Sequence, residues 1–179
     1  MKGKKKMKKI IIFTLAFIFC LFAVACGEEK TDDKSVSLDD TVKTVTEKYS
    51  MTDGFTFTSS SEVLGEYLDS DLILSYYGDA IAVPDFTKVS EYCVYIDETD
   101  ANVIIDVGIF KLSEASYADT LIEFIKGRIA DKREDYEEYP SIDIETLDAA
   151  VIKKSGSYVY YAIAYDVADI IKDIEAVIK

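Results

Sequence analysis

Between residues 38 and 49 the apolar side chains recur every three or four positions, a spacing that predicts an amphipathic helix. Ser37 precedes this stripe and is the expected N-cap. The Ser- and Thr-rich residues 52–61 predict a loop or a short extended piece. Helical spacing returns over 62–77, where a second helix is expected to stop at Gly78.

From residue 90 onward, alternating apolar positions give way to helical spacing, and this order occurs twice. Ser113 and Asp166 are the expected N-caps of the two helices that follow the strand pairs. Each hairpin needs a covered face, and the helix after it supplies an apolar stripe. We therefore expect an α+β fold in which two strand-strand-helix units form a four-stranded, mainly antiparallel sheet. Both helices are expected on one face, preceded by one or two N-terminal helices. The predicted strands cover residues 90–96, 102–112, 147–154 and 158–165.

Tyrosine is the commonest aromatic residue, with 13 copies in the chain. Four of them give the last predicted strand apolar surface on both faces, which indicates a central strand or a second covering layer, such as the helix over 62–77. They fit half-buried strand positions: Tyr158, Tyr160, Tyr161 and Tyr165. Tyr136 and Tyr139, in the acidic region after the long helix, are better candidates for an exposed contact.

The N-terminus has the three parts of a secretory signal peptide. Six lysines come first, and an apolar stretch over residues 10–25 follows, interrupted only by Thr14. At 16 residues this stretch is shorter than the roughly 20 that span a bilayer. We therefore predict that residues 1–25 are a signal peptide and that the remainder is exported.

The sequence around the cleavage site resembles a bacterial lipobox: Ala23-Val24-Ala25-Cys26-Gly27. Ala23 departs from the pattern, because lipoproteins usually carry Leu there. In this interpretation Cys26 is lipidated, and its lipid anchors the protein to the outer face of the cytoplasmic membrane. The alternative is ordinary secretion, which also cuts after Ala25. Residues 26–36 then form an acidic tether, and residues 37–179 form a single α+β domain.

The chain is acidic, and export makes it more so. Its formal net charge is −14, from 20 basic and 34 acidic residues. Loss of the six signal-peptide lysines leaves 14 basic residues and a mature charge of −20. Such a surface repels phosphate backbones, so no nucleic-acid partner is expected.

Few residues suggest chemistry. The chain has no histidine, which removes imidazole bases and ordinary zinc sites, and its scattered glycines form no phosphate-binding loop. No cofactor is expected. Cys93 lies in an apolar run and fits a buried hydrophobic position, and Arg128 is expected to form a structural ion pair. The close carboxylate pairs fit solvated turns better than a catalytic cleft: Asp69 with Asp71, Asp97 with Asp100, and Asp143 with Glu145.

The densest group of oxygen ligands lies in the turn after the first predicted strand. Asp97, Asp100 and Asn102 are weak candidates for a calcium site, without EF-hand spacing. Turn chemistry alone accounts for Asp and Asn at these positions, so no metal site is predicted.

An ordered set of short segments over about residues 67–179 is similar to a family of predicted clostridial lipoproteins, grouped as domain of unknown function 4358. The resemblance implies a Gram-positive cell-envelope lipoprotein, without a known activity, ligand or catalytic residue. The segments are Ser75-Tyr76-Tyr77-Gly78-Asp79, Glu91-Tyr92-Cys93-Val94-Tyr95, Val107-Gly108-Ile109-Phe110-Lys111, Lys126-Gly127-Arg128, Glu138-Tyr139-Pro140 and Lys154-Ser155-Gly156-Ser157-Tyr158-Val159.

Three functions remain open. The preferred one is a membrane-anchored extracytoplasmic lipoprotein whose domain binds an envelope protein or small ligand and is not an enzyme. The second is a small solute-binding lipoprotein, although 154 mature residues are few for two lobes that close on a ligand. The third is a cell-wall hydrolase that uses a carboxylate pair.

Overall fold

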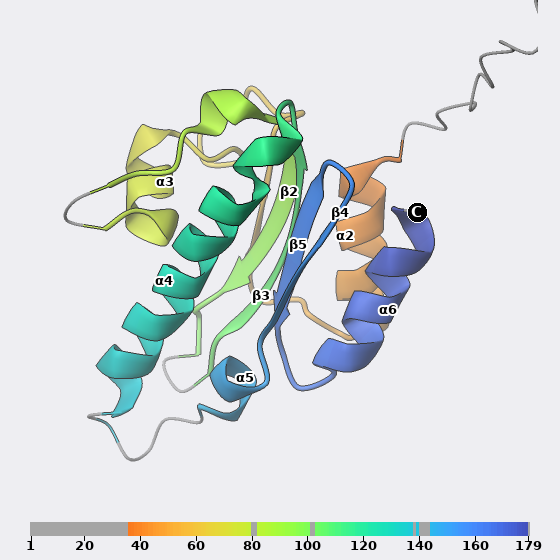
Figure 1. The fold of residues 1–179 in the computed structure, drawn as a ribbon. Coiled ribbons are helices and arrows are strands. Elements are labelled where there is room, and N and C mark those ends of the chain that lie inside the picture. Colours follow the sequence, from red (N-terminus) through yellow and green to blue (C-terminus); the bar gives the residue numbers. More distant parts are fainter. Residues whose placement is uncertain (1–35, 80–81, 101–102, 138, 140–143, 179) are drawn as a thin grey trace, which may run out of the picture. The chain divides into compact units, whose positions relative to one another are not determined.

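A five-stranded antiparallel sheet runs through the middle of the domain, with helices on both of its faces (Figure 1). This computed structural model describes residues 36–79, 82–100, 103–137, 139 and 144–178. The strand order is β1-β2-β3-β5-β4, so β3 is central and β1 and β4 are the edges. The strands are β1 (Phe55–Thr58), β2 (Val89–Asp97), β3 (Ile105–Leu112), β4 (Val151–Ser155) and β5 (Tyr158–Ile163).

The helices divide between the two faces of the sheet. On one face α3 and α4 pack over a core that includes Phe110, Leu121 and Tyr161. On the other face α2 and α6 pack over a core that includes Ile109, Tyr160 and Ile170. The helices are α2 (Leu38–Lys48), α3 (Ser70–Tyr77), α4 (Ala118–Glu137), α5 (Glu145–Asp148) and α6 (Val167–Val177); two 3₁₀ turns are η1 (Phe86–Lys88) and η2 (Ala115–Tyr117).

Side-chain alternation along β3 shows why both faces need a cover. Val107 and Ile109 point toward α2 and α6, whereas Phe110 and Leu112 point toward α4. All four are almost completely removed from solvent. Burial of each such side chain contributes about 1.5–3 kcal/mol.

The predicted α+β class is confirmed, but the predicted arrangement is wrong in two respects. The sheet has a fifth strand, because Phe55–Thr58 pairs with β2, within the segment predicted as a loop or a short extended piece. The two predicted helices also cover opposite faces: α4 lies on one and α6 on the other. The 20-residue α4 and α3 already fill one face, so the apolar stripe of α6 is buried on the other, beside α2.

The predicted second layer therefore exists, but α2 and α6 form it, because the helix predicted over 62–77 packs with α4. That helix is also shorter than predicted and begins at Ser70. Gly65 has φ +89°, a conformation that interrupts a helix. Asp69 caps α3, since its Oδ1 accepts hydrogen bonds from the backbone N–H groups of Asp71 and Leu72.

The predicted helix starts have mixed outcomes. Ser37 caps α2, accepting a 3.1 Å hydrogen bond from the backbone N–H of Asp40. Ser113 is not the cap of α4, because the 3₁₀ turn η2 precedes that helix. The N-cap residue of η2 is Glu114. Asp166 is the N-cap residue of α6, but its side chain makes no capping hydrogen bond.

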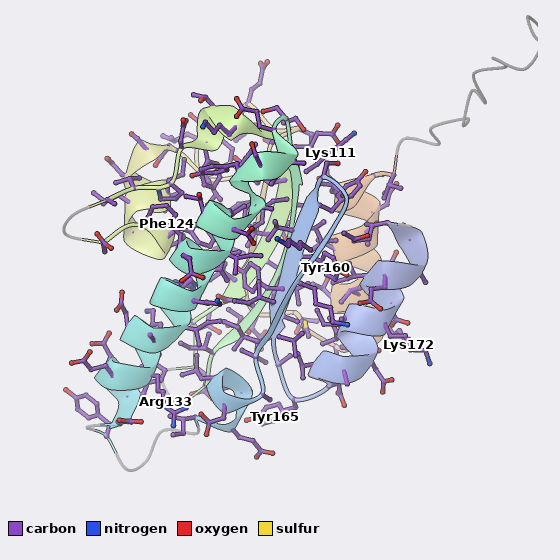
Figure 2. The ribbon with its side chains drawn as sticks, in the orientation of Figure 1. Lys111, Phe124, Arg133, Tyr160, Tyr165 and Lys172 are labelled. Carbon is purple, nitrogen blue, oxygen red and sulfur yellow. The ribbon has the colours of Figure 1, made fainter. Side chains whose placement is uncertain are left out.

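The strand predicted over 147–154 begins later than expected. Residues 145–148 form the short helix α5, and β4 starts at Val151. Leu147, the apolar residue that suggested a strand, is instead buried against the α4 face of the sheet. β5 ends at Ile163, so Tyr165 lies beyond it and is 53% exposed, contrary to the prediction of a half-buried strand position (Figure 2).

The predicted signal peptide, Cys26 and almost all of the tether lie outside the described residues. Within the part of the chain that the structure describes, no helix combines the length and apolarity needed to cross a membrane.

Candidate functional site

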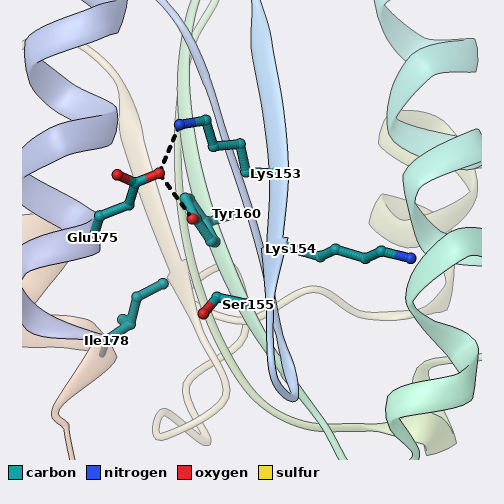
Figure 3. Close-up of a pocket in the computed structure, with 6 residues that line it drawn as sticks. All are labelled: Lys153, Lys154, Ser155, Tyr160, Glu175 and Ile178. Carbon is teal, nitrogen blue, oxygen red and sulfur yellow. Dashed lines mark hydrogen bonds and ion pairs between the residues drawn. The ribbon is translucent and has the colours of Figure 1, made fainter.

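The edge strand β4 and helix α6 border an open surface hollow of about 300 Å³ (Figure 3). Alternation along β4 places Lys153 and Ser155 on the α6 side, where Tyr160 of β5 is the cross-strand neighbour of Lys153. Lys154 points to the other side of the sheet, toward α4 (Figure 3). The lining residues are Lys153, Lys154, Ser155, Tyr160, Glu175 and Ile178.

Two polar groups in this hollow, those of Lys153 and Tyr160, are joined through the Glu175 carboxylate. Lys153 Nζ lies 2.6 Å from Glu175 Oε1, and the Tyr160 hydroxyl donates to the same oxygen at 3.2 Å. Burial, together with this hydrogen bond to a carboxylate, raises the pKa of Tyr160 to about 12. The hydroxyl therefore stays protonated at neutral pH and acts as a hydrogen-bond donor.

Lys154, whose side chain lies on the opposite face of β4, has an exposed ion-pair partner. Lys154 pairs with Asp119 at the start of α4, and the Asp119 side chain is 80% exposed. Exposed pairs of this kind contribute at most about 1 kcal/mol, so a competing carboxylate can replace Asp119.

A second polar cluster is buried between β3 and α4. Arg128 Nε and Nη2 lie 2.9 and 2.8 Å from Asp106 Oδ2, and Nη2 is also 2.8 Å from Glu98 Oε1. Lys132, one turn further along α4, lies 3.2 Å from the same Glu98 oxygen. The guanidinium also packs 5.0 Å from the ring centroid of Tyr76, a cation–π distance. The structural ion pair expected for Arg128 is thus confirmed, with its partner on the central strand.

The charges in this cluster stabilise one another. Burial raises the pKa of Asp106, and the Arg128 charge offsets only part of this effect. Burial acts on Glu98 in the same direction, but the positive charges of Arg128 and Lys132 outweigh it and lower its pKa. Asp106 Oδ1 and Thr146 Oγ1 are buried without a hydrogen-bond partner among the described residues. An arginine held in this way is suited to fixing α4 on the sheet.

Two buried tyrosines, Tyr77 and Tyr161, lie beside this cluster. The Tyr77 and Tyr161 hydroxyls are 2.8 Å apart, and burial raises the pKa of both. The Tyr161 ring lies over Gly108 of β3, where a Cβ atom would come within 2.3 Å of it. The absence of a side chain at Gly108 therefore makes room for Tyr161.

Two of the three weak calcium candidates, Asp97 and Asp100, lie among the described residues. Asp97 Oδ1 accepts hydrogen bonds from the backbone N–H and the hydroxyl of Thr99, the pattern of an Asx turn. The backbone carbonyl of Asp100 accepts from Val103, and Asn102 lies outside the described residues. Over the described ranges, no three His, Cys, Asp or Glu side chains are grouped as metal ligands.

The carboxylate pairs have structural roles where they are described. Asp69 caps α3, and Asp71 lies in its first turn. Asp97 is the last residue of β2, and Asp100 lies in the turn after it. Glu145 is the first residue of α5, and Asp143 is outside the described residues. Cys93 is fully buried, as expected, and burial raises the pKa of its thiol.

The two tyrosines proposed for exposed contacts differ from each other. Tyr139 is 60% exposed, whereas Tyr136 is half-buried against the α4 core, so the prediction is wrong for Tyr136. The hollow beside β4 was not predicted, because Lys153 and Glu175 are far apart in the sequence. The signal that was available is a pair of lysines on a short strand before a Gly-containing turn.

Comparison with known proteins gives one match. Residues 85–164 match the family model described as a domain of unknown function (DUF4358). This range runs from η1 to the residue after β5 and includes Asp106, Arg128 and Lys153. No curated protein and no solved structure matches the chain.

Proposed function

We propose that this chain, which belongs to the family of domain of unknown function DUF4358, is a membrane-anchored lipoprotein whose folded domain binds a partner in the cell envelope without catalysing a reaction. The anchor is the lipid on Cys26, and the tether over residues 26–36 gives the domain reach from the membrane. The basic and apolar segments before Cys26 support export.

The observation that carries the binding function is the hollow beside the exposed edge strand β4. Lys153, Tyr160 and Glu175 are held in one hydrogen-bonded arrangement there, so their positions are fixed before a partner arrives. Preorganised polar groups beside an accessible surface favour binding, because little side-chain entropy is lost on association.

The hollow favours a protein partner over an enclosed solute. It is open to the surface and has a volume of about 300 Å³. Small-molecule sites are concave and bury most of their ligand, and this volume is at the lower end of their range of about 300–1,000 Å³. An interaction surface requires no such enclosure.

Site-specific photocrosslinking in cells tests this proposal with the full-length chain. A photoreactive amino acid at Ser155, on the exposed end of β4, is expected to yield a discrete adduct with an envelope protein. The same amino acid at Lys43, an exposed position on α2, is the control and should yield none. Absence of any adduct from Ser155, with the protein correctly located, argues against the binding function.

A further inference from the structure

The two edges of the sheet are not equally open to a new strand. At the β1 edge, the backbone N–H of Thr58 donates a 2.8 Å hydrogen bond to the carbonyl of Glu66, in the turn that follows this strand. The chain therefore covers part of its own β1 edge. On the outer side of β4, no described residue forms a strand pair or a backbone hydrogen bond.

Hydrogen bonding on the neighbouring strands shows which backbone groups of β4 point outward. Leu112 of β3 donates to the carbonyl of Ser157, so Tyr158, the next residue, directs its own N–H and C=O groups away from β3 and toward β4. Tyr158 pairs with Ser155. Since the direction alternates along an antiparallel strand, Ser155 faces β5 and Lys154 faces outward, as does Ile152.

The side chains of this edge define the charge that a partner should carry. Lys153 lies on the α6 face and Lys154 on the α4 face, and both side chains are about half exposed, at 46% and 49%. Edge lysines normally discourage strand pairing. Here ion pairs with Glu175 and Asp119 hold both lysines against the faces of the sheet, which leaves the backbone edge accessible.

We propose that β4 accepts an extended peptide segment of a partner protein, which carries adjacent carboxylate residues opposite Lys153 and Lys154. Unpaired backbone N–H and C=O groups in a row are matched by another extended backbone. Adjacent residues of a strand lie on opposite faces, so two consecutive acidic residues meet one lysine each. We expect no further acidic residues in the partner segment, because the chain has a formal net charge of −14.

A second copy of this chain fits the edge less well. When the β4 strands of two copies pair antiparallel, residues directly opposite each other have their side chains on the same face. If the pairing is centred on Lys153, Lys153 of one copy lies opposite Lys153 of the other. Like charges placed directly opposite destabilise a strand pair. The net negative charge of both copies adds to this repulsion.

This inference rests on the proposed binding function and is tested with a defined probe. Chemical-shift changes are followed by NMR when the full mature chain in detergent micelles is titrated with the peptide Thr-Val-Thr-Asp-Glu-Thr-Val-Thr. The expected shifts centre on β4 and the lining of the hollow. Peptides with Asn-Gln or Lys-Lys at the centre are expected to bind more weakly, in that order.

Two variants at one position separate the backbone contribution from the charge. Lys154→Gln keeps the outward N–H and should weaken binding about two- to fivefold. Lys154→Pro also removes that N–H, while the hydrogen bonds to β5 stay in place, and should weaken binding by a further factor of about ten. The matched control is Thr56→Pro on the β1 edge, whose N–H also faces outward; it should bind as the wild type does.

Equal binding by Lys154→Gln and Lys154→Pro, with both variants folded by circular dichroism, overturns the backbone pairing. Peptide shifts that map away from β4, or equal affinity for the Asp-Glu and Lys-Lys peptides, overturn it as well. A crosslinked partner that still forms its adduct in Lys154→Pro cells refutes strand pairing but leaves the binding function intact. If wild-type cells give no adduct, the binding function itself fails.

Discussion

Two nitrogens of the Arg128 guanidinium donate hydrogen bonds to one carboxylate oxygen of Asp106. Nε lies 2.9 Å and Nη2 lies 2.8 Å from Asp106 Oδ2. The side chain of Asp106 is fully buried and that of Arg128 is 2% exposed. Asp106 lies on the central strand β3 and Arg128 on the 20-residue helix α4. This pair therefore joins α4 to the sheet through charges that water does not screen.

Replacement of Arg128 by Met is expected to destabilise the domain strongly. The substitution leaves the buried Asp106 carboxylate without a compensating charge, which costs about 3–5 kcal/mol. Urea denaturation followed by circular dichroism measures the loss in the free energy of unfolding.

A matched substitution on the same helix separates burial from charge. Arg133 pairs with Glu137 and with Asp148 at the surface, and the three side chains are 42%, 56% and 48% exposed. Because exposed pairs contribute little, Arg133→Met should change the free energy of unfolding by about 1 kcal/mol or less. The double variant Asp106→Leu, Arg128→Met should recover most of the loss. An Arg128→Met variant as stable as Arg133→Met contradicts the role given to the pair.

Gly108→Ala is expected to destabilise the domain because of the Tyr161 ring. The new Cβ would lie 2.3 Å from a ring carbon, and either the ring or the strand must move. Overpacking of this kind costs about 1–3 kcal/mol. Thermal unfolding of the variant gives the magnitude.

Gly127→Ala is the control for that experiment. Gly127 lies within α4 and has no neighbouring atom near the position of an added Cβ. Alanine in a helix interior is favoured over glycine, so stability should rise by about 0.5–1 kcal/mol. A stable Gly108→Ala variant would mean that the close approach of Tyr161 is not needed for packing.

The raised pKa of Tyr160 predicts that the folded domain loses stability at alkaline pH. Its pKa is raised from 10.0 in the unfolded chain to about 12 in the folded domain, so the folded state holds the proton more tightly. Its stabilising contribution is fully present below pH 10 and is lost as the pH rises toward 12. The Tyr160→Phe variant should lose less stability than the wild type over this interval.

Urea titrations at several pH values between 9 and 12 (a range set by those two pKa values) measure this difference. Tyr77 and Tyr161 also have raised pKa values, so the difference between variant and wild type is the relevant quantity. Tyr139→Phe, at an exposed position, serves as the control. Identical profiles for Tyr160→Phe and the wild type would contradict the prediction.

The lipid anchor is tested by Cys26→Ala. We expect this variant to lose incorporation of labelled fatty acid and to leave the membrane fraction, because it lacks the thiol to which the lipid is proposed to attach. Cys20→Ala, within the apolar segment of the signal, should keep both properties. Wild-type protein that is secreted without lipid would instead establish ordinary cleavage after Ala25.

Local patterns in the sequence predicted most elements because their causes are local. The apolar spacing of α2 and α6, the cap at Ser37 and the alternation in β2, β3 and β5 are each set within about ten neighbouring residues. The helix over 62–77 was predicted too long because the prediction relied on the local spacing of apolar residues. Spacing alone does not register the left-handed Gly65, which interrupts the helical pattern.

The sequence by itself therefore determined the α+β class, the resemblance to the family and the pattern that predicts export. Only the tertiary structure decided which face each helix covers, because an apolar stripe on a helix does not specify which of two apolar sheet faces it packs against. It also brought together Arg128 with Asp106 and Lys153 with Glu175, pairs that lie 22 residues apart along the chain in each case. Charge pairing between distant residues depends on strand order and register, and the choice between alternative registers is made by packing of the whole core.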